Sequence, residues 1–171
     1  NIDFDKPETN YYKVRLNHFT YNKGIFFNEN SPSDRWERIQ KEQDIQIKPW
    51  KNNDYDDSQY ILLLLQNPID TSLNPLIERG EKYDDWIIKT IRQIRNISSK
   101  KIRVRLHPRF LDRFNKEKLV EENVEISNNY AGWNKSNGGQ SLYDDFSKAW
   151  ACVTFSSNAA TEAVCEGIPV I

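Results

Sequence analysis

Residues 60–66, Tyr-Ile-Leu-Leu-Leu-Leu-Gln, constrain the fold of this chain more than any other stretch. The run is aliphatic at every position from 61 to 65 and shows no alternation with polar residues. Successive side chains of a strand point to opposite faces, so a strand without alternation is covered on both faces. Such strands are typical of parallel sheets, whose crossover helices lie on both sides. We therefore expect a buried strand of a parallel sheet here.

The segments after this strand alternate between helical and extended patterns. Residues 82–98 form the clearest helix, because Tyr83, Ile87, Ile91 and Ile94 recur at helical spacing. The remaining segments are expected in this order: strand 101–106, short helix 110–120, strand 124–126, a short helix capped by Ser141, strand 149–155, helix 159–166 and strand 168–171. This alternation predicts an α/β fold with a doubly wound parallel sheet.

The chain divides at a polar, acidic stretch, residues 51–58, that is typical of a linker. We expect residues 1–58 to be an N-terminal segment and residues 59–171 to be a Rossmann-like domain. Within the first segment the patterns predict strands at 11–21, 25–27 and 45–48 and a short helix that begins at Ser33. The chain does not begin with Met and stops inside an apolar run, so we expect it to be an excerpt whose domain continues after Ile171.

The charges are balanced. The chain has 24 Lys and Arg against 25 Asp and Glu, a net charge of −1, which gives no general attraction to nucleic acid or to an anionic membrane. No apolar run reaches the roughly 18 to 20 residues of a membrane span, and the first ten residues lack a signal-peptide pattern. We expect a cytoplasmic protein in which Cys152 and Cys165 are reduced core thiols.

The first candidate site lies where the apolar run 149–155 ends and a helix begins. The backbone N–H groups of a first helical turn have no helical partner, and the helix dipole is positive there, so such a turn suits an anion. We expect Glu162, one turn later, to reach a ribose hydroxyl, and Gly167 to end the helix as a structural turn. The residues expected to hold a phosphate are Ser156, Ser157 and Asn158. The alternative is a Ser-Asn cap on a core helix.

The second candidate site, His107-Pro108-Arg109, follows the predicted strand 101–106. His107 can act as a general acid or donate a hydrogen bond to a phosphate near neutral pH, and Arg109 can pair with a phosphate through two N–H groups. The alternative is a surface histidine before a turn-forming proline. Since ligands of open α/β sheets bind at the carboxyl ends of the strands, we expect both candidate sites at the same edge of the sheet.

Two charged clusters have simpler explanations. The basic run 100–118 can serve nucleic acid or an anionic acceptor, but we favour a solvated edge. Asp54, Asp56 and Asp57 lack an ordered ligand spacing, so no metal site is predicted. The sequence contains no Gly-rich dinucleotide fingerprint, Walker loop, zinc pattern or nucleophile elbow.

The two candidate sites together carry a resemblance to a known family. The pattern Ser-Ser-Asn-x-x-x-Glu-x-x-x-x-Gly-Ile-Pro-Val-Ile at 156–171 resembles the nucleotide-sugar site in the C-terminal domain of GT-B-fold glycosyltransferases, and is similar to that of the non-hydrolysing UDP-N-acetylglucosamine 2-epimerases. His107-Pro108 with Ser156-Ser157 resembles the His-Pro and Ser-Ser motifs of bacterial capsule glycosyltransferases, sialyltransferases and glycerophosphotransferases. The order of segments also looks like that of glycosyltransferases common in phage genomes. The resemblance covers residues 60–171.

The resemblance implies the Rossmann-like C-terminal half of a GT-B fold, which moves a sugar from a UDP- or CMP-type donor to a polysaccharide or other acceptor, without a metal or other cofactor. His107 would be the catalytic residue, binding a phosphate or assisting the leaving group, and Glu162 would contact the donor ribose. The residues that would bind the donor phosphates or add positive charge are Ser156, Ser157, Asn158, Arg105 and Arg109. Residues 1–58 are too short for the acceptor-side domain of the family, so no catalytic base is assigned.

Three alternatives remain open. A phage glycosyltransferase that acts on modified DNA bases would use the basic run 100–118 as its nucleic-acid contact. A sugar-nucleotide epimerase would need more acidic and histidine side chains around the sugar than the sequence places there. A non-catalytic nucleotide-binding domain would keep the fold without the chemistry.

Overall fold

The computed structural model describes residues 32–51, 57–129 and 139–171 of the chain. They fall into two compact units, Asn1–Gln43 and Asp44–Ile171, which are considered separately. In the first unit, helix α1 (Asp34–Glu42) follows Ser33 as predicted, and none of its residues is buried. The Ser33 hydroxyl donates to the Glu37 carboxylate at 2.6 Å. The strands predicted at 11–21 and 25–27 lie outside the described residues.

The second unit is built on four parallel strands in the order β3-β2-β1-β4. They are β1 (Tyr60–Leu64), β2 (Lys101–Arg105), β3 (Glu125–Ile126) and β4 (Ala149–Thr154). Every residue of β1 is buried, and the strand pairs with β2 on one side and with β4 on the other. Val170 forms a parallel bridge to Cys152, which places the predicted last strand beside β4. The predicted α/β parallel sheet is confirmed, and its strand order is consistent with a Rossmann-like fold.

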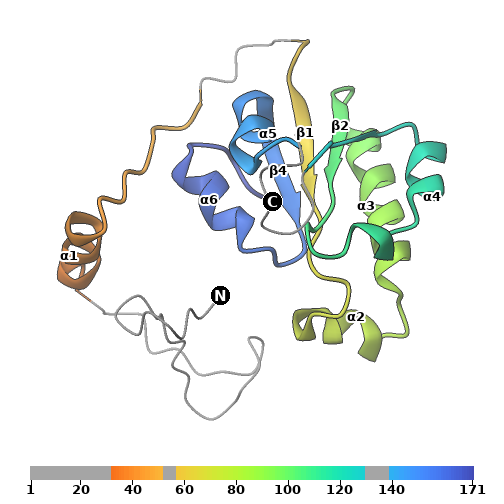
Figure 1. Ribbon diagram of the computed structural model, residues 1–171, viewed down its shortest axis with the longest axis horizontal. Helices are drawn as coiled ribbons and strands as arrows, with labels where there is room; N and C mark the ends of the chain where they lie inside the picture. The colour runs from red at the N-terminus through yellow and green to blue at the C-terminus, as the bar shows by residue number, and fades with distance from the viewer. Residues whose placement is uncertain (1–31, 52–56, 130–138) are drawn as a thin grey trace. The chain divides into compact units, whose positions relative to one another are not determined.

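Helices cover both faces of the sheet (Figure 1). Helices α3 (Tyr83–Ile97) and α4 (Lys116–Glu121) lie on one side, and α5 (Leu142–Lys148) and α6 (Ala159–Cys165) lie on the other. The side chains of β1 therefore enter two cores in alternation. Those at 61, 63 and 65 pack against α3 and α4, and those at 60, 62 and 64 pack against α5 and α6. This double cover explains why the sequence of β1 is apolar without alternation.

Three short helical segments complete the unit: η3 (Thr71–Leu73), α2 (Asn74–Glu78) and η4 (Leu111–Arg113). The helix predicted at 110–120 is therefore wrong as a single element, because it is divided into η4 and α4. The chain is extended at Phe114, which buries its ring in the core, and the Asn115 side chain then accepts a hydrogen bond from Lys118 N at 3.0 Å to begin α4. None of the described helices is long and apolar enough to cross a membrane.

Residues 44–51, assigned from sequence to the N-terminal segment, belong to the second unit. Lys48 N donates to Cys165 O and Lys51 N donates to Gly167 O, both at 2.8 Å. Gly167 has φ +73°, and a Cβ atom at this position would lie 2.1 Å from Pro49 O. The residue after α6 must therefore be small for two reasons, its left-handed backbone and the close approach of this segment.

Candidate functional site

The candidate site lies at the carboxyl edge of the sheet, where the strand order reverses. From β1 the chain runs outward through β2 to β3 and then crosses to the other side of β1 for β4. In open α/β sheets, ligands bind outside the carboxyl ends of the strands at such a switch point. The segments that leave the strands at this edge are residues 65–73 after β1, 106–111 after β2 and 155–158 after β4.

A hydrogen-bonded cluster of Gln66, Ser72 and Ser156 joins the first and last of these segments. Ser156 Oγ lies 2.7 Å from both Gln66 Oε1 and Ser72 Oγ, and Gln66 Nε2 donates to Ser72 Oγ at 2.6 Å. Gln66 is only 4% exposed, whereas Ser156 is exposed and Ser72 is half-buried. The two hydroxyls are thus presented to solvent by a buried amide group.

Each hydroxyl proton of the Gln66–Ser72–Ser156 cluster is used within the cluster, in either of two directions. An amide oxygen only accepts, so the single hydroxyl proton of Ser156 goes to Gln66 Oε1. The contact between the two hydroxyls then needs the proton of Ser72. If the Gln66 amide is turned over, the direction of every bond reverses, and both hydroxyl protons are still used. In this arrangement Ser156 has no proton to donate to a phosphate.

The turn after β4 is held to β1 by Thr154. The Thr154 hydroxyl donates to Leu64 O at 2.8 Å and accepts from Ser157 N at 3.2 Å. Ser157 Oγ accepts from Ala159 N at 3.3 Å, so within the described part of the chain the Ser157 hydroxyl keeps its own proton. Asn158 is exposed at the start of α6 and makes no side-chain capping bond. Ser157 and Asn158 thus retain donors that Ser156 lacks.

His107 follows β2 at the same edge. Its Nδ1 accepts a hydrogen bond from Arg109 N at 3.3 Å, which places the ring proton on Nε2. Its ring lies 5.3 Å from the ring of Phe110. Burial lowers the pKa of His107 below 6.5, the nearby positive charge of Arg109 lowers it further, and the negative charge of Asp70 opposes both. At neutral pH His107 is therefore uncharged, with an Nε2–H group that can donate.

The loop after β1 connects the two halves of the site. Asp70, whose charge acts on His107, accepts a hydrogen bond from Ser72 N at 2.9 Å. The backbone N–H of Gln66, at the start of the same loop, donates to the Tyr83 hydroxyl at 3.1 Å. No role was predicted from the sequence for Gln66, Asp70 or Ser72. The polar Gln66 that ends the aliphatic run was the one local signal for them.

Two of the predicted site residues are turned elsewhere. Arg105 is 6% exposed, and its guanidinium group pairs with the Asp145 carboxylate and donates to Gln140 O and Ser141 O, both at 3.1 Å. Glu162 is exposed on α6 and is hydrogen-bonded to Tyr143 of α5, which helps to raise the pKa of that phenol after the larger effect of burial. His107, Ser156, Ser157 and Asn158 thus follow strands at the carboxyl edge, whereas the charged groups of Arg105 and Glu162 are bound elsewhere.

Asp145 of α5 is fully buried at 0% exposure. It pairs with Arg105 and with Arg103 at 3.3 Å, and it accepts from the Ser127 hydroxyl at 2.6 Å. The neighbouring Asp144 forms a capping box with Ser141, which confirms the predicted cap of this helix. Two arginines of the basic run, Arg103 and Arg105, thus pair with a buried carboxylate, which disfavours a nucleic-acid surface along β2.

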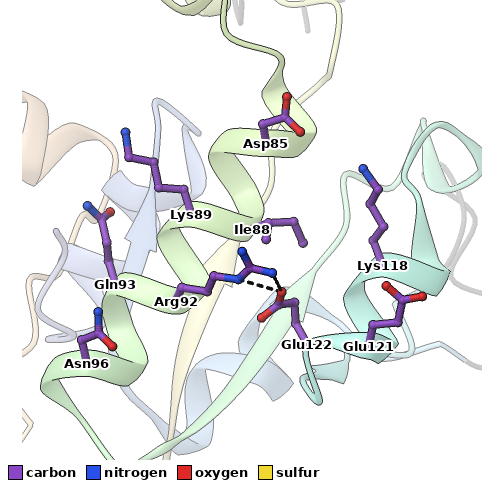
Figure 2. A pocket seen from close by; sticks show the side chains of 9 residues that line it. All are labelled: Asp85, Ile88, Lys89, Arg92, Gln93, Asn96, Lys118, Glu121 and Glu122. Carbon is purple, nitrogen blue, oxygen red and sulfur yellow. Dashed lines mark hydrogen bonds and ion pairs between the residues drawn. The ribbon is translucent and has the colours of Figure 1, made fainter.

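The pocket in Figure 2 is separate from the carboxyl-edge cluster. It has a volume of about 530 Å³ and is lined by side chains of α3 and α4 with mixed charges, including an ion pair of 2.5 Å between Arg92 and Glu122. None of the predicted site residues lines it. The described residues also contain no group of three or more His, Cys, Asp or Glu side chains placed to hold a metal ion.

No model of a known protein family, no curated protein and no solved structure matches this chain.

Proposed function

We propose that this protein is a GT-B-like glycosyltransferase that binds a nucleotide-activated sugar at the carboxyl edge of β1, β2 and β4. The observation that carries the proposal is the meeting of three loops at the switch point of a parallel sheet. Gln66 and Ser72 come from the loop after β1, Asp70 of that loop acts on His107 after β2, and Ser156 follows β4. The His-Pro and Ser-Ser motifs, far apart in sequence, thus follow strands of one sheet on either side of β1.

The chemistry requires stabilisation of a leaving diphosphate. The bond between the sugar carbon and the phosphate oxygen breaks and the nucleotide leaves with the electron pair. The acceptor hydroxyl oxygen forms the new bond to the sugar carbon, and its proton passes to water or to the departing phosphate. Groups that donate hydrogen bonds to the departing oxygen lower the barrier, because its charge grows in the transition state. In the proposal His107 Nε2–H is such a donor, and it acts as a neutral group because the pKa of His107 is lowered. The Ser157 hydroxyl, the Asn158 amide and Arg109 supply further donors.

Calorimetry with UDP-, CMP- and GDP-sugars tests the proposal. The wild-type protein is expected to bind at least one of them saturably, and His107→Ala is expected to weaken that binding by about tenfold, as for one hydrogen bond to a charged group. Ser99→Ala is a matched control, since this exposed serine lies just before β2, at the opposite edge of the sheet. Absence of saturable binding to every nucleotide sugar would contradict the proposal.

A further inference from the structure

We propose that the Gln66–Ser72–Ser156 cluster is a hydroxyl subsite, which accepts a hydrogen bond from a sugar hydroxyl of the ligand, and that it does not bind phosphate. The inference rests on the proposed function and refines it, because it fixes which part of the ligand meets which loop. It departs from the role expected for Ser156 from the sequence.

The first step is the count of free hydrogen-bonding positions. With the Ser156 proton directed to Gln66 Oε1, the 2.7 Å contact between the two hydroxyls uses the proton of Ser72, whose oxygen also accepts from Gln66 Nε2. A hydroxyl has one proton and two lone pairs. Each serine of the cluster therefore keeps one lone pair and no proton. A ligand that approaches these two oxygens must supply the proton itself.

A ligand group that donates a proton fits these two oxygens, and one that only accepts does not. A phosphate near neutral pH offers mostly acceptor oxygens, and its approach to two lone pairs is repulsive unless the cluster opens. Opening the cluster would leave the buried amide of Gln66 without its partners, which costs roughly 1 to 3 kcal/mol for an unsatisfied buried polar group. A sugar hydroxyl donates its proton to one serine without disturbing the cluster. The geometry thus selects a hydroxyl donor.

Donors for a phosphate lie beside the cluster and not within it. The loop after β1 places Ser72 on the side of Ser156 and Asp70 on the side of His107, within one turn of η3. His107 and Arg109 on one side, and Ser157 next to the cluster, carry donors for an anion. The ligand is therefore oriented with a sugar at the cluster and its phosphates on the neighbouring donors.

Adjacent serines provide the test. Binding of inorganic pyrophosphate, UDP and UDP-glucose is measured by calorimetry for the wild type, Ser156→Ala, Ser72→Ala and Ser157→Ala. Ser156→Ala and Ser72→Ala are expected to weaken the binding of UDP-glucose by about five- to tenfold, as for one net hydrogen bond, and to leave the binding of pyrophosphate unchanged. Ser157→Ala is expected to weaken all ligands that contain phosphate. If Ser156→Ala and Ser72→Ala weaken the binding of UDP-glucose alone, the hexose occupies the subsite. If they weaken the binding of UDP as well, the ribose occupies it.

A parallel loss of pyrophosphate binding in Ser156→Ala would overturn the subsite, and so would UDP-glucose binding that is unchanged in both Ser72→Ala and Ser156→Ala. If the wild type binds no nucleotide sugar, the proposed function fails, and a second measurement still decides the subsite. Methyl β-glucoside and methyl riboside are titrated into the isotope-labelled full chain while the side-chain NH₂ signals of Gln66 are followed by NMR. Saturable shifts of these signals with either glycoside support the hydroxyl subsite. Shifts with pyrophosphate alone, or no shifts at all, overturn it.

Discussion

Ser156 Oγ and Gln66 Oε1 are 2.7 Å apart, although 90 residues separate them in the sequence. Their contact ties the end of β4 to the end of β1 at the switch point of the sheet. The side chain of Gln66 is almost fully buried and both of its polar atoms are hydrogen-bonded, so it stabilises the edge as well as shaping it.

Gln66→Leu is therefore expected to lower the free energy of unfolding by about 1 to 2 kcal/mol, because two side-chain hydrogen bonds of the cluster are lost while the buried volume is kept. Urea unfolding followed by circular dichroism measures the change. Ser99→Ala, outside the cluster, should stay within about 0.5 kcal/mol of the wild type. Equal stability of Gln66→Leu and wild type would show that the cluster contributes nothing to folding.

Asp145 supports the fold from inside. Asp145→Ala is expected to destabilise the protein by about 3 to 5 kcal/mol, since the buried carboxylate balances Arg105 and Arg103 and its removal leaves a buried charge without compensation. Glu125→Ala is the matched control, because its ion pair with Arg103 is half exposed and should be worth less than about 1 kcal/mol. Chemical unfolding of both variants gives the comparison, and similar small losses in the two would contradict the structural role of Asp145.

Gly167 and Gly80 form a natural pair for testing the contact between residues 44–51 and α6. Both have positive φ, +73° and +72°, but a Cβ at Gly167 would meet Pro49 O at 2.1 Å, whereas one at Gly80 would meet nothing within 4 Å. Gly80→Ala should cost only the backbone strain of about 1 to 2 kcal/mol. Gly167→Ala should cost more and displace this segment.

Hydrogen exchange measured by NMR separates the two glycine variants. In Gly167→Ala the amides of Lys48 and Lys51, which donate to Cys165 O and Gly167 O, should lose protection, and in Gly80→Ala they should keep it. Unchanged protection in Gly167→Ala would mean that the chain at Pro49 accommodates the methyl group without leaving α6.

The central elements of the fold were predictable because their signals are local. The aliphatic run predicted β1, and the helical spacing of Ile87, Ile91 and Ile94 predicted α3 within one residue of its bounds at each end. The same holds for β4 and α6, whose patterns of apolar and small residues switch at the turn between them.

The side-chain partnerships were not predictable from such patterns. The basic run around Arg105 favours an exposed cation at this position. In the structure its partner Asp145 lies 40 residues later, on a helix that packs over β2 and β1. The pairing exists only once the sheet has formed. For the same reason the cluster that Ser156 forms with Gln66 and Ser72, in which its single proton is used, could not be predicted from the sequence. The pattern of residues 45–48 predicts a strand, but none forms there. Backbone hydrogen bonds to Cys165 and Gly167 hold this segment instead, and such bonds leave no mark on the side-chain pattern.

The two cysteines should differ in reactivity. Both are free thiols, as the sequence analysis expected. Burial raises the pKa of Cys152 to about 12, the positive charge of Lys51 lowers it by a smaller amount, and the negative charge of Asp145 raises it again. Cys165 is half-buried at the end of α6. Since the thiolate is the reacting form, iodoacetamide at pH 8 should alkylate Cys165 first and Cys152 only on unfolding, as read by peptide mass spectrometry. Equal rates in the folded protein would contradict the buried position of Cys152.

The charge state of His107 gives a pH prediction. Its folded pKa is lowered below 6.5, so between the folded and unfolded pKa values the unfolded chain binds more protons. The contribution of His107 to stability is therefore complete above pH 6.5 and is lost as the pH falls from there toward the folded pKa. NMR titration of the ring should give a midpoint below 6.5, which Arg109→Ala raises, because a positive charge is removed, and Asp70→Asn lowers, because a negative charge is removed. A midpoint above 6.5 in the wild type, or shifts of the opposite sign in the variants, would contradict a neutral His107 donor at pH 7.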